Sequence, residues 1–246
     1  MKLSRLILNF LVVALCQLAS GSPSLAQAEK KDQEAELTIL RKQASALVKE
    51  RKLSKARPIA LKVVSLEQSL HGQSPALVGD LSRVIAVSCA SDRCFDALPE
   101  LRHILELKSK LYGENYPGKP FTLQMIGEAY EKKNDFENAE KYYREAIDSQ
   151  IRVRKNDRDT IDLALNINLV RLYEKQNRLE EAEALYRRLL YQEKQRGLKA
   201  SGSLMQSTLS GYRQLLSKQG RQAEARALKP DLPAPSGAVS PLSPRH

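Results

Sequence analysis

Apolar residues between positions 35 and 228 recur at the spacing of α-helices rather than of strands. The clearest stretch holds two such stripes, separated by a short polar break at residues 133–135. The first stripe consists of Leu123, Ile126, Gly127 and Tyr130, and the second of Phe136, Ala139, Tyr143 and Ala146. Asp135 can cap the second helix by accepting backbone N–H bonds, and in a related stretch Asn177 followed by Glu180 is typical of a capping box. The pattern predicts pairs of amphipathic helices joined by tight turns.

The helix pair is repeated along the chain. The segments 135–146 and 178–189 superimpose, each with an alanine followed four residues later by a tyrosine. The same small position recurs at intervals of 41, 42, 43 and 43 residues, at Ala56, Ala97, Ala139, Ala182 and Ala225. Nine residues before each alanine stand Leu47, Ser88, Tyr130, Tyr173 and Leu216. This periodicity predicts five helix-turn-helix units that approach closely at the alanines.

The third unit, with L-x2-I-G-x2-Y followed by A-x3-Y-x2-A, resembles the tetratricopeptide repeat, whose usual length is 34 residues. The longer period near 42 residues, with residues 111–117 opening the next unit, resembles the kinesin-light-chain variety. The resemblance covers about residues 35–228 and is strongest over 119–191. It implies an all-α fold, a right-handed α-solenoid of about five units. Ser88, in place of an aromatic residue, and Pro99, early in a second helix, are departures from the pattern.

The N-terminal 28 residues follow different rules. Lys2 and Arg5 precede an apolar run at residues 6–16, and small residues lead to Ala28. This is typical of a cleaved secretory signal peptide, and it predicts a periplasmic or secreted protein without stable membrane insertion after cleavage. An uncleaved anchor would need about 20 apolar residues. Lipid attachment at Cys16 is disfavoured because Leu15 stands where lipoproteins have a small residue. A chain that is not exported would instead be a cytoplasmic scaffold.

Two further segments lie outside the repeats. Residues 29–34 are highly charged and are expected to be a frayed lead-in to the first repeat. Residues 229–246 hold several prolines among small residues and predict a disordered tail, which could alternatively serve as a ligand for another domain.

The two cysteines after the signal peptide, Cys89 and Cys94, are expected to form a disulfide in an oxidising compartment, with free thiols as the alternative. Five residues of continuous helix rise about 7.5 Å, more than the ~7 Å between Cα atoms that a disulfide tolerates. The helix must therefore break between them, and residues 90–93 are predicted to be a turn.

Charge and composition leave the function open between two kinds of binding. Removal of residues 1–28 lowers the formal net charge from +11 to +9. A basic chain favours acidic partners, although solvated Lys and Arg on helix faces would explain the same excess. No nucleophile elbow, phosphate-binding glycine loop or metal-ligand spacing is present, and the three histidines, His71, His103 and His246, form no ligand pair. We therefore expect no enzyme activity, no cofactor and no metal.

Family resemblance implies a concave groove lined by the first helix of each unit, holding a peptide or a helix of another protein. An anionic polymer, either envelope glycan or nucleic acid, is the alternative partner. Removing the expected core positions from each first helix leaves the groove candidates Arg41, Ser45, Lys49, Ser82, Ala86, Gln124, Glu128, Glu131, Ile167, Arg171, Glu174, Lys175, Ser210, Gln214 and Lys218.

Overall fold

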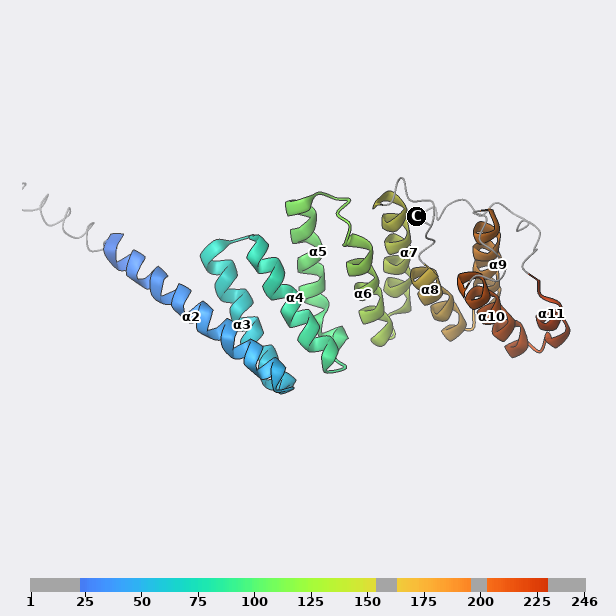
Figure 1. Ribbon diagram of the computed structural model, residues 1–246, viewed down its shortest axis with the longest axis horizontal. Coiled ribbons are helices and arrows are strands. Elements are labelled where there is room, and N and C mark those ends of the chain that lie inside the picture. The colour runs from blue at the N-terminus through green and yellow to red at the C-terminus, as the bar shows by residue number, and fades with distance from the viewer. Residues whose placement is uncertain (1–22, 154–162, 196–202, 230–246) are drawn as a thin grey trace, which may run out of the picture. The chain divides into compact units, whose positions relative to one another are not determined.

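The computed structural model describes residues 23–153, 163–195 and 203–229, and every element in those ranges is helical (Figure 1). The chain divides into an N-terminal body, up to Arg93, and a C-terminal body that begins at Cys94. The N-terminal body contains α2 (Pro23–Lys49), α3 (Leu53–His71) and α4 (Pro75–Ala90). The C-terminal body contains η1 (Cys94–Ala97), α5 (Leu98–Tyr112), α6 (Lys119–Lys132), α7 (Phe136–Val153), α8 (Leu163–Lys175), α9 (Leu179–Gln195), α10 (Ser203–Lys218) and α11 (Gln222–Ala227).

These helices confirm the predicted all-α repeat fold. The first and second helices of repeat one are α2 and α3, and those of repeats three, four and five are the pairs α6–α7, α8–α9 and α10–α11. Repeat two comprises α4 and, beyond η1, α5. All five repeat alanines are buried, with no more than 5% of any of them exposed. The alanine register read from the sequence is therefore the packing register.

A left-handed residue ends the first helix of every repeat, five positions before the alanine. These residues are Arg51, Asp92, Asn134, Asn177 and Gly220, with φ of 56°, 55°, 59°, 57° and 77°. The backbone N–H of the following residue bonds to the carbonyl nine positions before the alanine, over 2.9–3.0 Å: Lys52 to Leu47, Arg93 to Ser88, Asp135 to Tyr130, Arg178 to Tyr173 and Arg221 to Leu216. This is the Schellman arrangement that satisfies the last carbonyls of a helix.

The turn geometry confirms one predicted cap and corrects another. The Oδ1 of Asp135 accepts the N–H of Asn138 at 3.2 Å, as expected of a cap on α7. The capping box expected at Asn177 is wrong, because Asn177 is the left-handed residue that ends α8, one position too early to cap α9. Ala182 instead bonds to the carbonyl of Arg178. Asparagine tolerates both roles, so its identity alone could not separate them.

A close contact between glycine and tyrosine joins the two helices of repeat three. A methyl group on Gly127 of α6 would lie 2.6 Å from the ring of Tyr143 of α7, which is fully buried. Only a residue without a Cβ lets the tyrosine ring lie against the α6 backbone here. The same ring position in repeat four, Tyr186, lies against Gly211 of α10.

The other segments predicted from the sequence lie only partly within the residues that the structure describes. Residues 29–34, expected to fray, lie inside α2. Most of the predicted signal peptide (1–22) and nearly all of the tail (230–246) lie outside the described residues. In the ranges that the structure covers, no helix is long and apolar enough to span a bilayer. The helix break predicted between Cys89 and Cys94 is present, since α4 ends at Ala90 and η1 begins at Cys94, and the two cysteines form a close pair.

Candidate interaction surface

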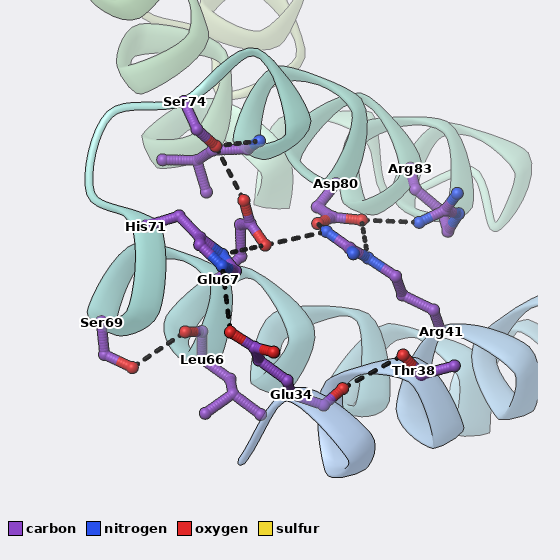
Figure 2. A network of polar contacts seen from close by, with 11 residues as sticks. Glu34, Thr38, Arg41, Leu66, Glu67, Ser69, His71, Ser74, Asp80 and Arg83 are labelled. Atoms are coloured by element: carbon purple, nitrogen blue, oxygen red, sulfur yellow. Dashed lines mark hydrogen bonds and ion pairs between the residues drawn. The ribbon is translucent and has the colours of Figure 1, made fainter. Parts of the chain in front are cut away.

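The groove candidate Arg41 lies in a network of polar contacts inside the N-terminal body (Figure 2). Its guanidinium bonds to Asp80 of α4 and, at 3.0 Å, to Glu67 of α3. Both carboxylates are buried, with 3% of Asp80 and 1% of Glu67 exposed. Arg41 therefore links α2 to the next two helices and compensates two buried charges, which leaves little of its bonding capacity for a partner.

Glu67 is the centre of that network. Its carboxylate accepts a bond from the Ser74 hydroxyl at 2.7 Å and lies 3.0 Å from the Nδ1 of His71. Ser74 in turn accepts the N–H of Leu77 and so caps α4. Burial alone would raise the pKa of Glu67, but the bonds from Ser74 and His71 and the charge of Arg41 lower it on balance. The Glu67 carboxylate is thus held in its charged form.

In the C-terminal body the first helices of repeats three and four are joined by bonds that involve the predicted groove residues Gln124, Glu128, Glu131 and Lys175. Gln124 donates to Glu128 within α6 at 2.8 Å, and Asn168 of α8 donates to the same carboxylate at 3.4 Å. Glu131 of α6 accepts the hydroxyl of Tyr143 at 2.9 Å and lies 3.6 Å from the ammonium of Lys175.

Repeats four and five are joined in an equivalent way. Lys218 of α10 bonds to Glu174 of α8 at 2.6 Å. Glu174 corresponds to Glu131, and Lys218 to Lys175, when the repeats are aligned on their alanines. These acidic and basic candidates therefore hold neighbouring first helices in register.

The other candidates are more accessible. Ile167 is half-buried against the core, and Ser45 in the N-terminal body is half-buried. The hydroxyl of Ser82 bonds to the carbonyl of Val78 one turn earlier. Exposed side chains are Lys49, Ser82 and Ala86 in the N-terminal body, and Arg171, Lys175, Ser210, Gln214 and Lys218 in the C-terminal body.

Sequence reasoning missed one residue of this face, Phe121. It precedes Gln124 by three residues and Glu128 by seven on α6, so it lies on the same helical stripe. Its side chain is 63% exposed, which is unusual for a phenylalanine on a packed helix. The three-residue spacing could have identified it, but the sequence alone did not reveal that its ring stays out of the core.

A second set of contacts joins the second helix of one repeat to the first helix of the next repeat and to the turn that follows it. Glu140 of α7 bonds to Arg144 at 2.8 Å on its own helix, to Arg178 at 2.5 Å and to the hydroxyl of Tyr173 at 2.9 Å. Burial would raise the pKa of Glu140, but the bonds from Arg178, Arg144 and Tyr173 lower it on balance. We call this set of residues the Glu140 clamp.

The clamp recurs 43 residues later around Glu183. Glu183 bonds to Arg187 at 2.9 Å, to Arg221 of the next repeat and to the hydroxyl of Tyr212 at 2.8 Å. Tyr212 is one helical turn earlier than the position equivalent to Tyr173, which is Leu216. The phenol thus reaches the same carboxylate from a different position.

In the part of the chain that the structure describes, no group of His, Cys, Asp and Glu side chains could hold a metal ion. The geometry of the described helices is that of a repeat scaffold: stacked helix pairs, small residues at the helix contacts and polar clamps between successive units. It defines the class of helix-turn-helix repeat proteins.

Comparison with known proteins names the repeat. Residues 81–152 and 164–200 match family models described as tetratricopeptide repeat. The structure is similar to the kinesin light chain nearly identical TPR-like repeats of Podosopora anserina, with a TM-score of 0.58 and 14% identity over 78% of this chain and 90% of that one. It is also similar to BtubC (BKLC) of P. vanneervenii, with a TM-score of 0.57 and 20% identity over 83% of this chain and 81% of that one. No curated protein matches the chain in sequence.

The matched segments, residues 81–152 and 164–200, are tetratricopeptide repeats, and the fold of the chain is kinesin-light-chain-like. Such repeats form a non-catalytic scaffold and generally mediate binding between proteins. At these identities the likeness to the solved structures concerns the fold.

Proposed function

We propose that the C-terminal body binds another protein, as an extended peptide or a helix, across the exposed side chains of α6, α8 and α10. The main support for this site is the exposure of Phe121, an aromatic side chain on a face whose neighbouring helices are fixed to one another. Aromatic side chains are enriched in protein interfaces relative to the rest of the surface, where they fill pockets of the partner. Arg171 and Gln214 are exposed on the same face and would supply polar contacts around the anchor.

The cross-helix bonds support this proposal because they reduce the cost of binding. The pairs Glu131–Lys175 and Glu174–Lys218 fix the spacing of successive first helices before a partner arrives. A surface that is ordered in advance loses less conformational entropy on binding. The bonds also explain why these four side chains are poor choices for the primary contact, since their charges are already compensated.

The alternative partner, an anionic polymer, draws its support from net charge. Ion pairs leave that net charge unchanged, but they hold many basic side chains of the C-terminal body against carboxylates and so make them less available to a polymer: Lys119, Arg144, Lys175, Arg178, Arg187, Lys218 and Arg221. A peptide partner is therefore the better supported of the two.

Site-specific photo-crosslinking in the native host tests the proposal. A photoreactive residue at position 121 or 214 should crosslink to a discrete protein, whereas the same residue at Lys141, exposed on the second helix α7, should not. The variant Arg171→Glu should weaken the crosslink from position 214. Equal crosslinking from position 141 would contradict the proposal. Retention of the chain on glycan or nucleic acid that disappears steeply with salt would favour the polymer instead.

Export and the disulfide belong to the same proposal. We propose that residues 1–28 are removed on export and that Cys89 and Cys94 are bridged in the mature protein. Fractionation of the host followed by intact mass measurement should give a chain beginning at Glu29 in the exported fraction. Alkylation without reduction should leave both cysteines unmodified. A full-length chain in the cytosol with two alkylated thiols would contradict both parts.

A further inference from the structure

The outer face of α2 has no packing partner among the described residues of the N-terminal body. α2 packs on α3 through Leu37 and Ala44, whose exposed fractions are 3% and 0%. Residues 25–36 are exposed without exception, and this part of α2 extends beyond α3 in Figure 1. Glu34 in this stretch lies 3.9 Å from the Nε2 of His71 in α3, but a helix of this length with few tertiary contacts is marginally stable in water. A partner on this helix would account for its order.

The side of α2 opposite Leu37 and Ala44 carries a regular seam. Its positions alternate by three and four residues, and all of them are exposed: Leu25, Ala28, Asp32, Ala35, Ile39, Lys42, Ala46 and Lys49. Alternation of three and four is the spacing by which two helices pack along their length. Leu25 and Ile39 are 60% and 63% exposed, so the apolar members of the seam face solvent. The alanines between them would permit close approach of a second helix.

The charges of the seam indicate what that second helix is. If α2 is turned end for end about Leu37, the seam superimposes on itself, with Asp32 opposite Lys42 and Ala35 opposite Ile39. Two copies packed in this antiparallel way would form two Asp32–Lys42 pairs. A parallel arrangement would place Asp32 opposite Asp32 and Lys42 opposite Lys42, which is repulsive. Self-complementarity under a two-fold rotation is the requirement for an isologous dimer.

We propose that the chain forms an antiparallel homodimer through the outer face of α2, with the two-fold axis near Leu37. The Asp32–Lys42 and Ala35–Ile39 layers lie after residue 28, so this contact persists when the predicted signal peptide is removed. The face belongs to the N-terminal body and shares no residue with the exposed positions of α6, α8 and α10, so each dimer would carry two copies of the partner-binding surface. This inference does not depend on what that surface binds.

The test is sedimentation equilibrium of the chain as its host processes it, over a concentration series at low ionic strength. We expect a dimer for the wild type. Asp32→Lys or Lys42→Asp should raise the dissociation constant of the dimer by about tenfold, because each substitution turns two exposed ion pairs into repulsive contacts. The double variant Asp32→Lys/Lys42→Asp should restore wild-type association. Lys30→Asp, exposed on the other side of α2, is the matched control and should change little.

A cysteine at Ala46 separates the two orientations. In the antiparallel dimer the two copies of residue 46 are about 27 Å apart along the helix axis and should not form a disulfide. A parallel dimer would bring them together, and rapid crosslinking of Ala46→Cys would overturn the proposal. A wild-type chain that stays monomeric at high concentration would overturn it as well. So would single swaps that leave the dimer intact, or a double swap that does not restore it.

Discussion

Replacing Glu140 by glutamine should loosen the contact between repeats three and four without changing the fold. The substitution keeps the size of the side chain and an oxygen for the Tyr173 hydroxyl, but it removes the negative charge shared by Arg144 and Arg178. Only 19% of the Glu140 side chain is exposed, so water screens these bonds less than it screens a surface pair. The result should be a less stable C-terminal body.

The expected loss is about 1 to 2 kcal/mol, which is the range for hydrogen bonds to a charged, partly buried group. It is kept at this level because Arg178 retains its bonds to Glu181 and Gln176. On the scale of this chain such a loss lowers the midpoint of thermal unfolding by about 2–6 °C. Glu137→Gln, on an exposed carboxylate at the start of the same helix, is the control and should move the midpoint by much less.

The stability difference between wild type and Glu140→Gln should depend on pH. The pKa of Glu140 is lower in the folded protein than its ordinary value of 4.5. Its stabilising contribution is therefore present above pH 4.5 and is lost as the pH falls through the folded-state pKa. Urea unfolding should show the largest difference between wild type and Glu140→Gln at neutral pH, and the two should converge as the solution is acidified below 4.5.

A double-mutant cycle with Arg178→Gln completes the test. If the clamp is a coupled unit, the two substitutions together should cost less than the sum of their separate effects, with a coupling of about 1 kcal/mol. Strict additivity, or a difference that persists unchanged at low pH, would refute the assignment of Glu140 as a charged link between repeats.

Three further predictions use the backbone and the helix contacts. Gly127→Ala should destabilise the chain by about 1–3 kcal/mol through overlap with Tyr143, whereas Gly79→Ala, in a helix with nothing within 4 Å, should be neutral or stabilising by up to about 1 kcal/mol. Arg51→Gly should raise the unfolding free energy by up to about 1 kcal/mol, because Arg51 has a φ of 56° that glycine adopts freely; circular dichroism melts would measure it. Ala139→Arg should cost at least 1–3 kcal/mol, and an unchanged melt would contradict the repeat register.

The fold could be predicted from the sequence because the residue pattern that specifies each helix pair lies within about 40 residues and recurs along the chain. Each repeat has an alanine at the helix contact, two apolar stripes and a polar break between its helices. Five imperfect copies of this pattern define the repeat register, which a single copy would not. The left-handed residues were missed as a set because only Gly220 is a glycine. Arg51 carries no sign of a positive φ, and Asp92 is of a type that occurs in turns and caps with either sign of φ; their common distance of five residues from an alanine becomes meaningful only once the turn geometry is known.

The candidate surface was harder to predict because its residues have two competing uses. Arg41, Glu131 and Lys175 lie at the expected first-helix positions, yet each is bonded to another helix of the chain. Sequence spacing places a side chain on a face but does not tell whether that face is satisfied by the next repeat. The bonds at issue join residues about 40 positions apart, beyond the range of any helical pattern.

Ser88, which departs from the repeat pattern, makes an inter-helix hydrogen bond at a position where another repeat uses a tyrosine. In repeats three and four the residue after the repeat alanine, Glu140, bonds to Tyr173, nine positions before the next alanine. In the N-terminal body the equivalent pair is Arg57 and Ser88, and the Nε of Arg57 donates to the serine hydroxyl at 3.0 Å.

Ser88 is fully buried and also donates to the carbonyl of Val84, so both its bonding roles are used. A tyrosine at position 88 could not replace both bonds, because its hydroxyl would lie far from the Val84 carbonyl. Serine at position 88, where the family pattern has an aromatic residue, therefore suits the arginine at position 57, because its hydroxyl accepts the bond from Arg57. Ser88→Ala should destabilise the N-terminal body by about 1 kcal/mol or more, while Ser82→Ala, whose hydroxyl bonds to the backbone in the same way on an exposed face, should have a much smaller effect.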